Sequence, residues 1–206
     1  ARNWVRLRQT PPRERRVALI LANYPNRDSR IGNGVGLDTP ASAVVVLEAM
    51  RAAGYDIRDQ PADGAALIAR LLSGPSNARP TAGAAEELSL ADYAAWFSSL
   101  PRTVQDQVTT RWGPPEKDPF YRPGRTDCGA FRVPALRCGN VVIGVQPARG
   151  YNIDPQKSYH DPALVPPHGY LAFYAWLREG FRAQAIIHFG KHGNLGALRL
   201  QRLATR

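Results

Sequence analysis

Three short runs of almost uninterrupted apolar residues constrain the fold of this chain most. They lie at residues 16–23, 140–145 and 185–189. Strands buried on both faces in a parallel sheet have this uniform composition, whereas strands with one solvated face alternate apolar and polar residues. A helical pattern at 169–177 separates the last two runs and gives the order strand, long loop, helix, strand. The sequence therefore predicts an α/β fold with parallel-sheet βαβ units.

A polar, Gly-rich loop follows the first run and leads into a second helical pattern. Thr39 is predicted as the N-cap and Pro40 as the first helical residue, where the missing N–H has no cost. The helix is expected to end at Gly54. The glycines at 32–36 do not match a dinucleotide-binding fingerprint, because Leu37 stands where its third glycine belongs. The helix start then either receives a carboxylate or forms a plain turn with a cap.

The middle of the chain is predicted to be a helical insertion, at about 62–113. Helical patterns cover 62–74, 89–99 and 101–112, and the last two are expected at the surface. Residues 116–126 are turn-rich and expected to be irregular, and a short strand is predicted at 131–133.

Composition narrows the class of partner. The formal net charge is +10, and residues 1–16 and 196–206 together carry +8 of it, so the middle is nearly neutral. No aromatic-interleaved basic strand or recognition helix accompanies the charge, so we expect no nucleic-acid partner. No apolar run is long enough for a membrane span and no secretory leader is present, which favours a cytoplasmic protein without a membrane partner. Cys128 and Cys138 are too few for a four-ligand zinc site.

The loop after the third apolar run carries the strongest functional signal. His188 and His192 are separated by four residues, the spacing of two zinc ligands on a metalloprotease helix. Phe189 stands where that motif has its general-base carboxylate, and Gly190 and Gly193 oppose a helix, so this class is excluded. The two histidines either bind a metal ion or carry protons, or they form hydrogen bonds to the backbone.

Two further segments could contribute to a site. Residues 151–155 and 159–161 offer oxygen and nitrogen ligands after a strand, but aspartates beside prolines are also common in turns. His168 lies at a predicted helix start, where it either caps the helix or faces a pocket. The aromatic residues of that helix are predicted to be core (Tyr170, Phe173, Tyr174 and Trp176).

Several of these motifs together resemble the family of the aerobic cobaltochelatase large subunit CobN and the magnesium chelatase H subunit. The resemblance extends over most of 17–195. The motif at 188–195 has Lys191 and Asn194, and the predicted helix contains Trp176-Leu177-Arg178. In these residues the chain is more similar to the cobalt enzyme than to the magnesium enzyme. The segments that carry the resemblance are 23–26, 33–40, 141–146, 150–155, 166–170 and, above all, 188–195.

The resemblance implies a part of the subunit that holds tetrapyrrole and metal. The reaction would be ATP-dependent insertion of Co²⁺ into hydrogenobyrinic acid a,c-diamide, a step of cobalamin biosynthesis. ATP would be hydrolysed by AAA+ partner subunits of the CobS and CobT type, in agreement with the absence of a phosphate-binding Gly-x-x-x-x-Gly-Lys-Ser/Thr loop here. The alternatives are a magnesium chelatase H-type subunit that inserts Mg²⁺ into protoporphyrin IX, and a non-catalytic tetrapyrrole-binding module.

The resemblance also implies roles for individual residues. His188 and His192 would be catalytic and bind the metal ion, because imidazole suits Co²⁺ and can accept a pyrrolic proton. Lys191 would bind a substrate carboxylate. The remaining substrate-binding residues would be Asn194, His168, Tyr151 and Asp154.

The match to the family motif weakens after Leu195. The family continues with a glutamate, whereas here Gly196 precedes an Arg- and Leu-rich end. We therefore predict three regions: a basic entry segment at 1–16, the family-like region at 17–195, and a non-family tail at 196–206 that a shifted or truncated reading frame would explain. The start at Ala1 fits a partial piece of a larger multidomain subunit, which is expected to be inactive alone.

Overall fold

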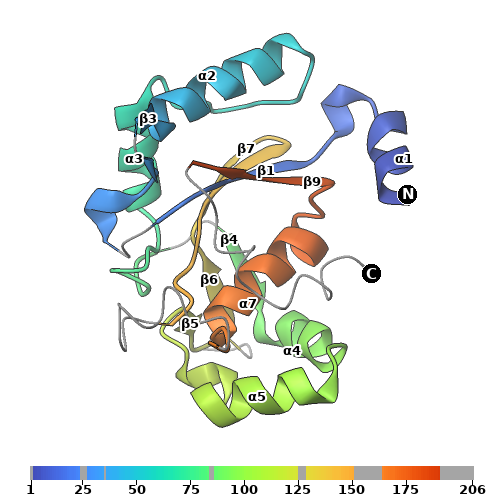
Figure 1. Cartoon of the computed structure of the whole chain (residues 1–206), viewed down its shortest axis with the longest axis vertical. Helices are drawn as coiled ribbons and strands as arrows, with labels where there is room; N and C mark the ends of the chain where they lie inside the picture. The colour runs from blue at the N-terminus through green and yellow to red at the C-terminus, as the bar shows by residue number, and fades with distance from the viewer. Residues whose placement is uncertain are drawn as a thin grey trace.

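The computed structural model describes residues 2–23, 27–34, 36–83, 86–124, 129–150 and 164–190. Its centre is a four-stranded sheet in the order β7-β8-β1-β9 (Figure 1). Strand β1 (Val17–Leu21) pairs in parallel with β8 (Val141–Val145) on one side and with β9 (Ala185–Phe189) on the other. Strand β7 (Ala135–Cys138) pairs with β8 in the antiparallel direction. The predicted α/β class and the three apolar strands are confirmed.

Helices cover both faces of this sheet. Helices α2 (Thr39–Ala52) and α3 (Gly64–Leu72) lie on one face, and α7 (His168–Ala175) with the π-helical turn η4 (Trp176–Gly180) lies on the other (Figure 1). Successive residues of β1 alternate between the two sides. Val17, Leu19 and Leu21 belong to the core with α2 and α3, whereas Ala18 and Ile20 belong to the core with α7.

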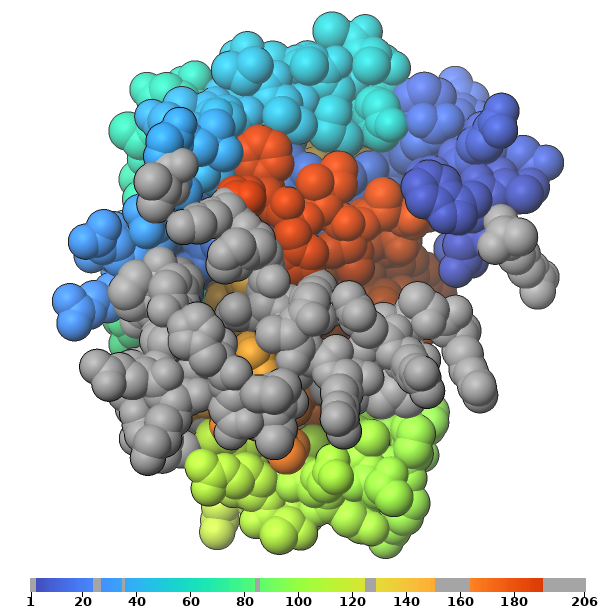
Figure 2. All heavy atoms as spheres, viewed as in Figure 1, coloured from blue at the N-terminus to red at the C-terminus, as the bar shows by residue number. Residues whose placement is uncertain are grey.

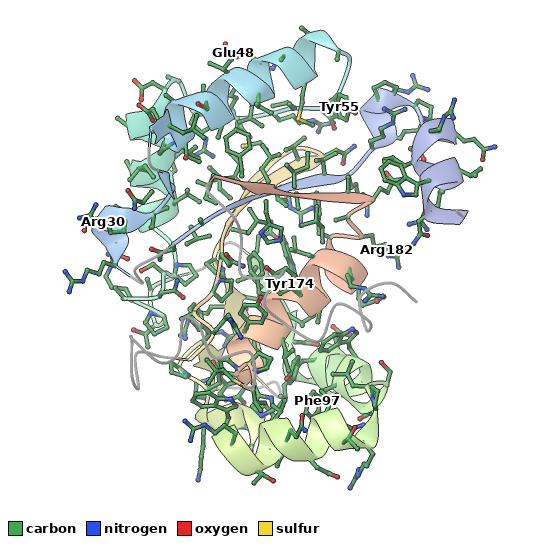
Figure 3. All side chains as sticks on the ribbon, viewed as in Figure 1. Arg30, Glu48, Tyr55, Phe97, Tyr174 and Arg182 are labelled. Atoms are coloured by element: carbon green, nitrogen blue, oxygen red, sulfur yellow. The ribbon has the colours of Figure 1, made fainter. Side chains whose placement is uncertain are left out.

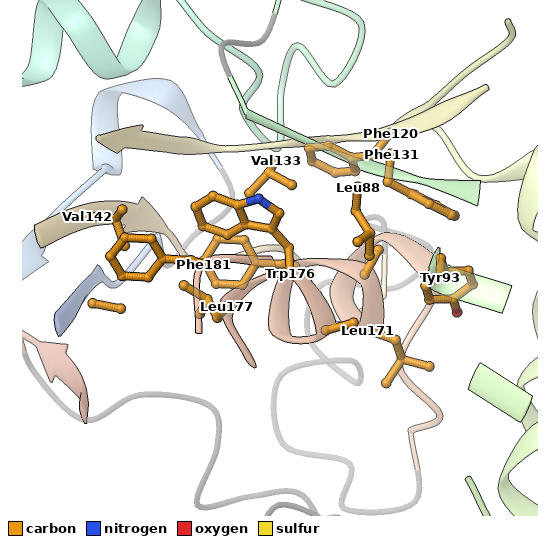
Figure 4. Close-up of a cluster of buried hydrophobic side chains, with 14 of the residues drawn as sticks. Leu88, Tyr93, Phe120, Phe131, Val133, Val142, Leu171, Trp176, Leu177 and Phe181 are labelled. Carbon is orange, nitrogen blue, oxygen red and sulfur yellow. The ribbon is translucent and has the colours of Figure 1, made fainter. Parts of the chain in front are cut away.

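A second, three-stranded antiparallel sheet was not predicted. It has the order β4-β6-β5, formed by β4 (Glu86–Ser89), β6 (Ala130–Val133) and β5 (Tyr121–Arg122). Helices α4 (Leu90–Ser98) and α5 (Arg102–Trp112) pack beside it. More than half of the residues of each helix are exposed, in agreement with the predicted surface position, whereas Tyr93 and Val108 are fully buried in the core against α7. Figure 4 shows Tyr93 with other members of that core.

Arg137 joins the two sheets. From β7 it donates two hydrogen bonds to Glu86 on β4, with Nε to Oε1 at 2.6 Å and Nη2 to Oε2 at 2.8 Å. Its guanidinium also lies 5.2 Å from the ring centre of Phe181. The Arg137–Glu86 ion pair therefore fixes β4 of the small sheet to β7, the edge strand of the large sheet.

Shorter elements complete the described chain. Helix α1 (Arg2–Gln9) precedes β1, and β2 (Asn33–Gly34) pairs with β3 (Leu37–Asp38) in the loop before α2. Three short 3-10 turns are η1 (Pro12–Glu14), η2 (Asp28–Arg30) and η3 (Pro115–Lys117). Among the described residues, no helix has both the length and the apolar character that crossing a membrane requires.

Candidate functional site

The parallel strands β1, β8 and β9 end at the same edge of the sheet. Leu21 is in register with Val145 on one side and with Phe189 on the other. In open α/β sheets the carboxyl ends of the strands are the usual place for a ligand. Buried polar side chains gather here immediately after the strands, with Asn23 after β1 and Gln146 after β8. This edge is therefore the candidate site.

His188 lies on β9, one residue before the strand ends. Its register partner is Ile20, so its side chain is on the α7 face, and its ring centre is 6.4 Å from that of Tyr174. Figure 3 labels Tyr174 on α7. The Nε2 atom of His188 is buried and has no hydrogen-bond partner among the described residues. Burial lowers the pKa of the imidazole. The ring is therefore neutral near pH 7, with one nitrogen that no group in the described part of the chain satisfies.

Gln146 connects the strand end to the same helix. Its Nε2 donates to the hydroxyl of Tyr174 at 3.3 Å, and its backbone N donates to the carbonyl of Leu21 at 3.0 Å. Asn77 fixes the segment from the other side, because its Nδ2 donates to the carbonyl of Gln146 at 3.0 Å and its Oδ1 accepts from the backbone N of Ala148 at 2.8 Å. Gln146 and Tyr174 are held by several elements, as a preorganised site requires.

Two tyrosines of α7 line this edge with an arginine nearby. The ring centres of Tyr170 and Tyr174 are 5.0 Å apart. Burial raises the pKa of both hydroxyls, and for Tyr170 the positive charge of Arg149 acts against that rise. Both tyrosines are therefore neutral hydrogen-bonding groups at physiological pH. The sequence pattern indicated core for both tyrosines, and the structure places the Tyr174 ring near the His188 ring.

His168 lies elsewhere: it is the first residue of α7 and packs against α4. Its Nε2 is 3.0 Å from the carbonyl of Gly113, which can only accept, so Nε2 carries the proton. Its Nδ1 then accepts from the hydroxyl of Tyr93 at 2.6 Å. The side chain is 1% exposed, and burial lowers its pKa. Both ring nitrogens are engaged inside the core, so its substrate-binding role stays a prediction that these contacts do not favour.

The start of α2 holds a carboxylate of the chain itself. Oδ1 of Asp38 accepts from the backbone N of Ala41 at 3.0 Å, so Asp38 is the N-cap and the predicted cap at Thr39 is wrong by one residue. The helix start was predicted either to receive a carboxylate or to form a plain turn with a cap, and the structure favours the plain cap. Thr39 is fully buried, and within the described ranges its Oγ1 has no hydrogen-bond partner. A Cβ atom added at Gly190 would lie 3.8 Å from that oxygen, so Thr39 adjoins the loop after β9.

The other predicted site residues lie outside the described residues. They are His192, Lys191, Asn194, Tyr151 and Asp154. Within the described ranges, no group of three or more His, Cys, Asp or Glu side chains is placed to hold a metal ion. His188 is thus the described member of the predicted metal-binding pair.

Comparison with known proteins identifies the family. A family model described as CobN/Magnesium Chelatase matches residues 1–200. The chain belongs to the CobN/magnesium chelatase family. The match includes residues 1–16 and extends five residues beyond Leu195.

Relatives of CobN type are more similar to the chain than relatives of magnesium chelatase type. The chain is 58% identical to the aerobic cobaltochelatase subunit CobN of Sinorhizobium sp over 94% of its length, and 53% identical to that of Pseudomonas aeruginosa over 95%. Its identity to the magnesium-chelatase H subunit of Rhodobacter capsulatus is 32% over 92%. These matches cover 15% to 16% of the relatives' own lengths.

A solved structure agrees in fold. The catalytic subunit of cobaltochelatase from Mycobacterium tuberculosis matches 94% of this chain with a TM-score of 0.79 and 44% identity. The chain corresponds to 16% of that subunit. The α/β region described above is therefore one part of a larger CobN-type fold.

Proposed function

We propose that this chain is part of the tetrapyrrole- and metal-binding subunit of an aerobic cobaltochelatase. The reaction is insertion of Co²⁺ into hydrogenobyrinic acid a,c-diamide in cobalamin biosynthesis, in the cytoplasm. AAA+ partner subunits hydrolyse the ATP. The observation that carries the proposal is the buried Nε2 of His188 at the carboxyl edge of the parallel strands, which no described residue pairs with.

Metal insertion needs a group that binds Co²⁺ weakly and one that accepts the inner protons of the macrocycle. A neutral imidazole suits both tasks, because it offers a lone pair to a borderline metal ion and can take up a proton. Burial keeps His188 neutral by lowering its pKa. His192 follows four residues later and is proposed as its partner, with Lys191 and Asn194 for polar groups of the substrate.

Cobalt is preferred to magnesium because the CobN relatives are 53% to 58% identical to this chain, against 32% for the magnesium-chelatase relative from Rhodobacter capsulatus. The ligand type agrees, since imidazole nitrogen suits Co²⁺, whereas Mg²⁺ prefers oxygen ligands.

The proposal is tested by titrating the purified chain with hydrogenobyrinic acid a,c-diamide and, separately, with protoporphyrin IX, followed by absorbance and fluorescence. We expect saturable binding of the corrinoid and weaker binding of the porphyrin. A parallel titration with Co²⁺ alone should give the visible bands of a nitrogen-ligated ion. The His188→Ala, His192→Ala double variant should lose these bands.

His168→Gln is the matched control, because it also removes one imidazole but from the core. It should keep Co²⁺ and corrinoid binding once circular dichroism shows that it is folded. Equal binding of both tetrapyrroles, or Co²⁺ bands that survive in the double variant, would contradict the proposal. Loss of corrinoid binding in a folded His168→Gln variant would instead support the predicted substrate-binding role of His168.

A further inference from the structure

Strand β9 forms an open edge of the central sheet. Among the described residues it pairs with β1 alone, and the order of strands ends at it. Ile186 is 38% exposed and Ile187 is 44% exposed. Their register partners Ala18 and Leu19 point to opposite faces of the sheet, so apolar side chains are uncovered on both faces of one strand. Strand β9 therefore has the apolar composition that is typical of a central strand, although it lies at the edge of the described sheet.

The free edge includes the backbone of His188. The N of Ala185 donates to the carbonyl of Arg16, toward β1. Because successive residues of a strand direct their backbone groups to opposite sides, Ile186 and His188 direct theirs to the open edge. Figure 2 shows the orange-red segment that ends at residue 190 at the surface, between α2 and α1.

We propose that the β9 edge receives a further strand from the same polypeptide, from the part of the CobN-type subunit outside these 206 residues. The chain matches 15% of Sinorhizobium CobN and 16% of the Mycobacterium tuberculosis subunit, so most of a subunit of that size lies outside it. The added strand covers Ile186 and Ile187 and binds the backbone of His188. This inference rests on family membership and does not depend on which metal or tetrapyrrole the site takes.

The test is thiol accessibility in a chimera in which this chain replaces the segment that it matches in Sinorhizobium CobN. Ile186→Cys and Ile187→Cys are compared with Val45→Cys, which is on α2 and whose native side chain is 60% exposed. Each variant is labelled with a maleimide, and the modified peptide is quantified by mass spectrometry. In the chimera, both β9 thiols should react at least about tenfold more slowly than the thiol at 45. In the 206-residue chain, all three should react at similar rates.

Two results would overturn the proposal. One is reaction of the β9 thiols in the chimera at the rate of the thiol at 45. The other is slow reaction of the β9 thiols already in the 206-residue chain. If this protection increases with protein concentration, a second copy of the chain occupies the edge. If the protection does not depend on concentration, residues of this chain cover the edge. The thiol at 45 reports on the same folded chimera, and no readout involves metal or corrinoid. Failure here is thus distinguishable from failure of the proposed function.

Discussion

The hydroxyl of Tyr93 lies 2.6 Å from Nδ1 of His168 and joins α4 to the first residue of α7. The carbonyl of Gly113 holds the other ring nitrogen, so the imidazole is fixed in one tautomer. Next to it, the backbone N of Gly169 donates to Oδ2 of Asp118 at 2.6 Å. These bonds hold the start of α7 in place. The same helix provides Tyr170 and Tyr174 at the candidate site.

Tyr93→Phe should destabilise the chain. The substitution keeps the buried ring but leaves Nδ1 of His168 without a donor, which costs about 1–3 kcal/mol of unfolding free energy. Urea unfolding followed by circular dichroism measures the change. Tyr55→Phe is the control, because its hydroxyl accepts from Arg15 in a part-buried position where water can replace the bond. Equal losses in the two variants would show that the Tyr93 hydroxyl has no special role.

Stability should fall as the pH is lowered through about 6.5, the ordinary pKa of histidine. Burial lowers the pKa of His168 and of His188 in the folded chain, so the unfolded chain binds more protons in this range. Unfolding free energy then decreases with falling pH until the pH is below the folded-state pKa values. Urea titrations at pH 7.5, 6.5 and 5.5 test this. His168→Gln should reduce the slope, and an unchanged slope in that variant would count against the buried neutral imidazole.

The three parallel strands of the large sheet were predictable, whereas β7 was not, and of the small sheet only β6 was predicted, at 131–133. Strands β1, β8 and β9 are short, almost uninterrupted apolar runs, the pattern of strands in a parallel sheet. The small sheet uses strands of two to four residues that carry charges, such as Glu87 opposite Arg132. Strand β4 pairs with β6 across more than forty residues of sequence, and no local pattern indicates such pairing, whereas β5 has only two residues and is too short to give a strand signal. The cap of α2 was missed by one residue because Asp38 and Thr39 are both good capping residues.

The candidate site was predictable only in part. The motif around His188 identified the loop after β9, because histidines beside glycines at a strand end are unusual in a core. Tyr174 and Gln146 gave no such signal, since an aromatic residue in an apolar helix indicates packing. Their place in the site depends on the packing of α7 against the ends of β8 and β9, a long-range contact that no local sequence pattern indicates. The predicted roles of the residues after Gly190 stay predictions.

Arg137→Lys should weaken the junction between the two sheets. A lysine cannot form the paired bonds to both oxygens of Glu86 while stacking near Phe181. The expected loss is about 1 kcal/mol, because the Arg137 side chain is partly exposed and water screens part of the interaction. Arg58→Lys is the matched control: Arg58 also binds a carboxylate twice, but its partner Asp56 is two residues away in the chain. Equal thermal shifts in the two variants would mean that the junction adds nothing.

Gly144→Ala should strain the interface between β8 and α7. A Cβ atom at this position would lie 2.7 Å from Cζ of Phe173 and 3.1 Å from Cδ1 of Ile20, and both side chains are buried. Overpacking of this kind costs about 1–3 kcal/mol, because the surrounding side chains must leave their preferred rotamers. Gly83→Ala is the control, since a Cβ atom there meets no atom of the described residues within 4 Å. The two variants are compared by urea unfolding under identical conditions. A stable Gly144→Ala variant would mean that α7 can move away from the sheet, and with it the Tyr174 ring from His188.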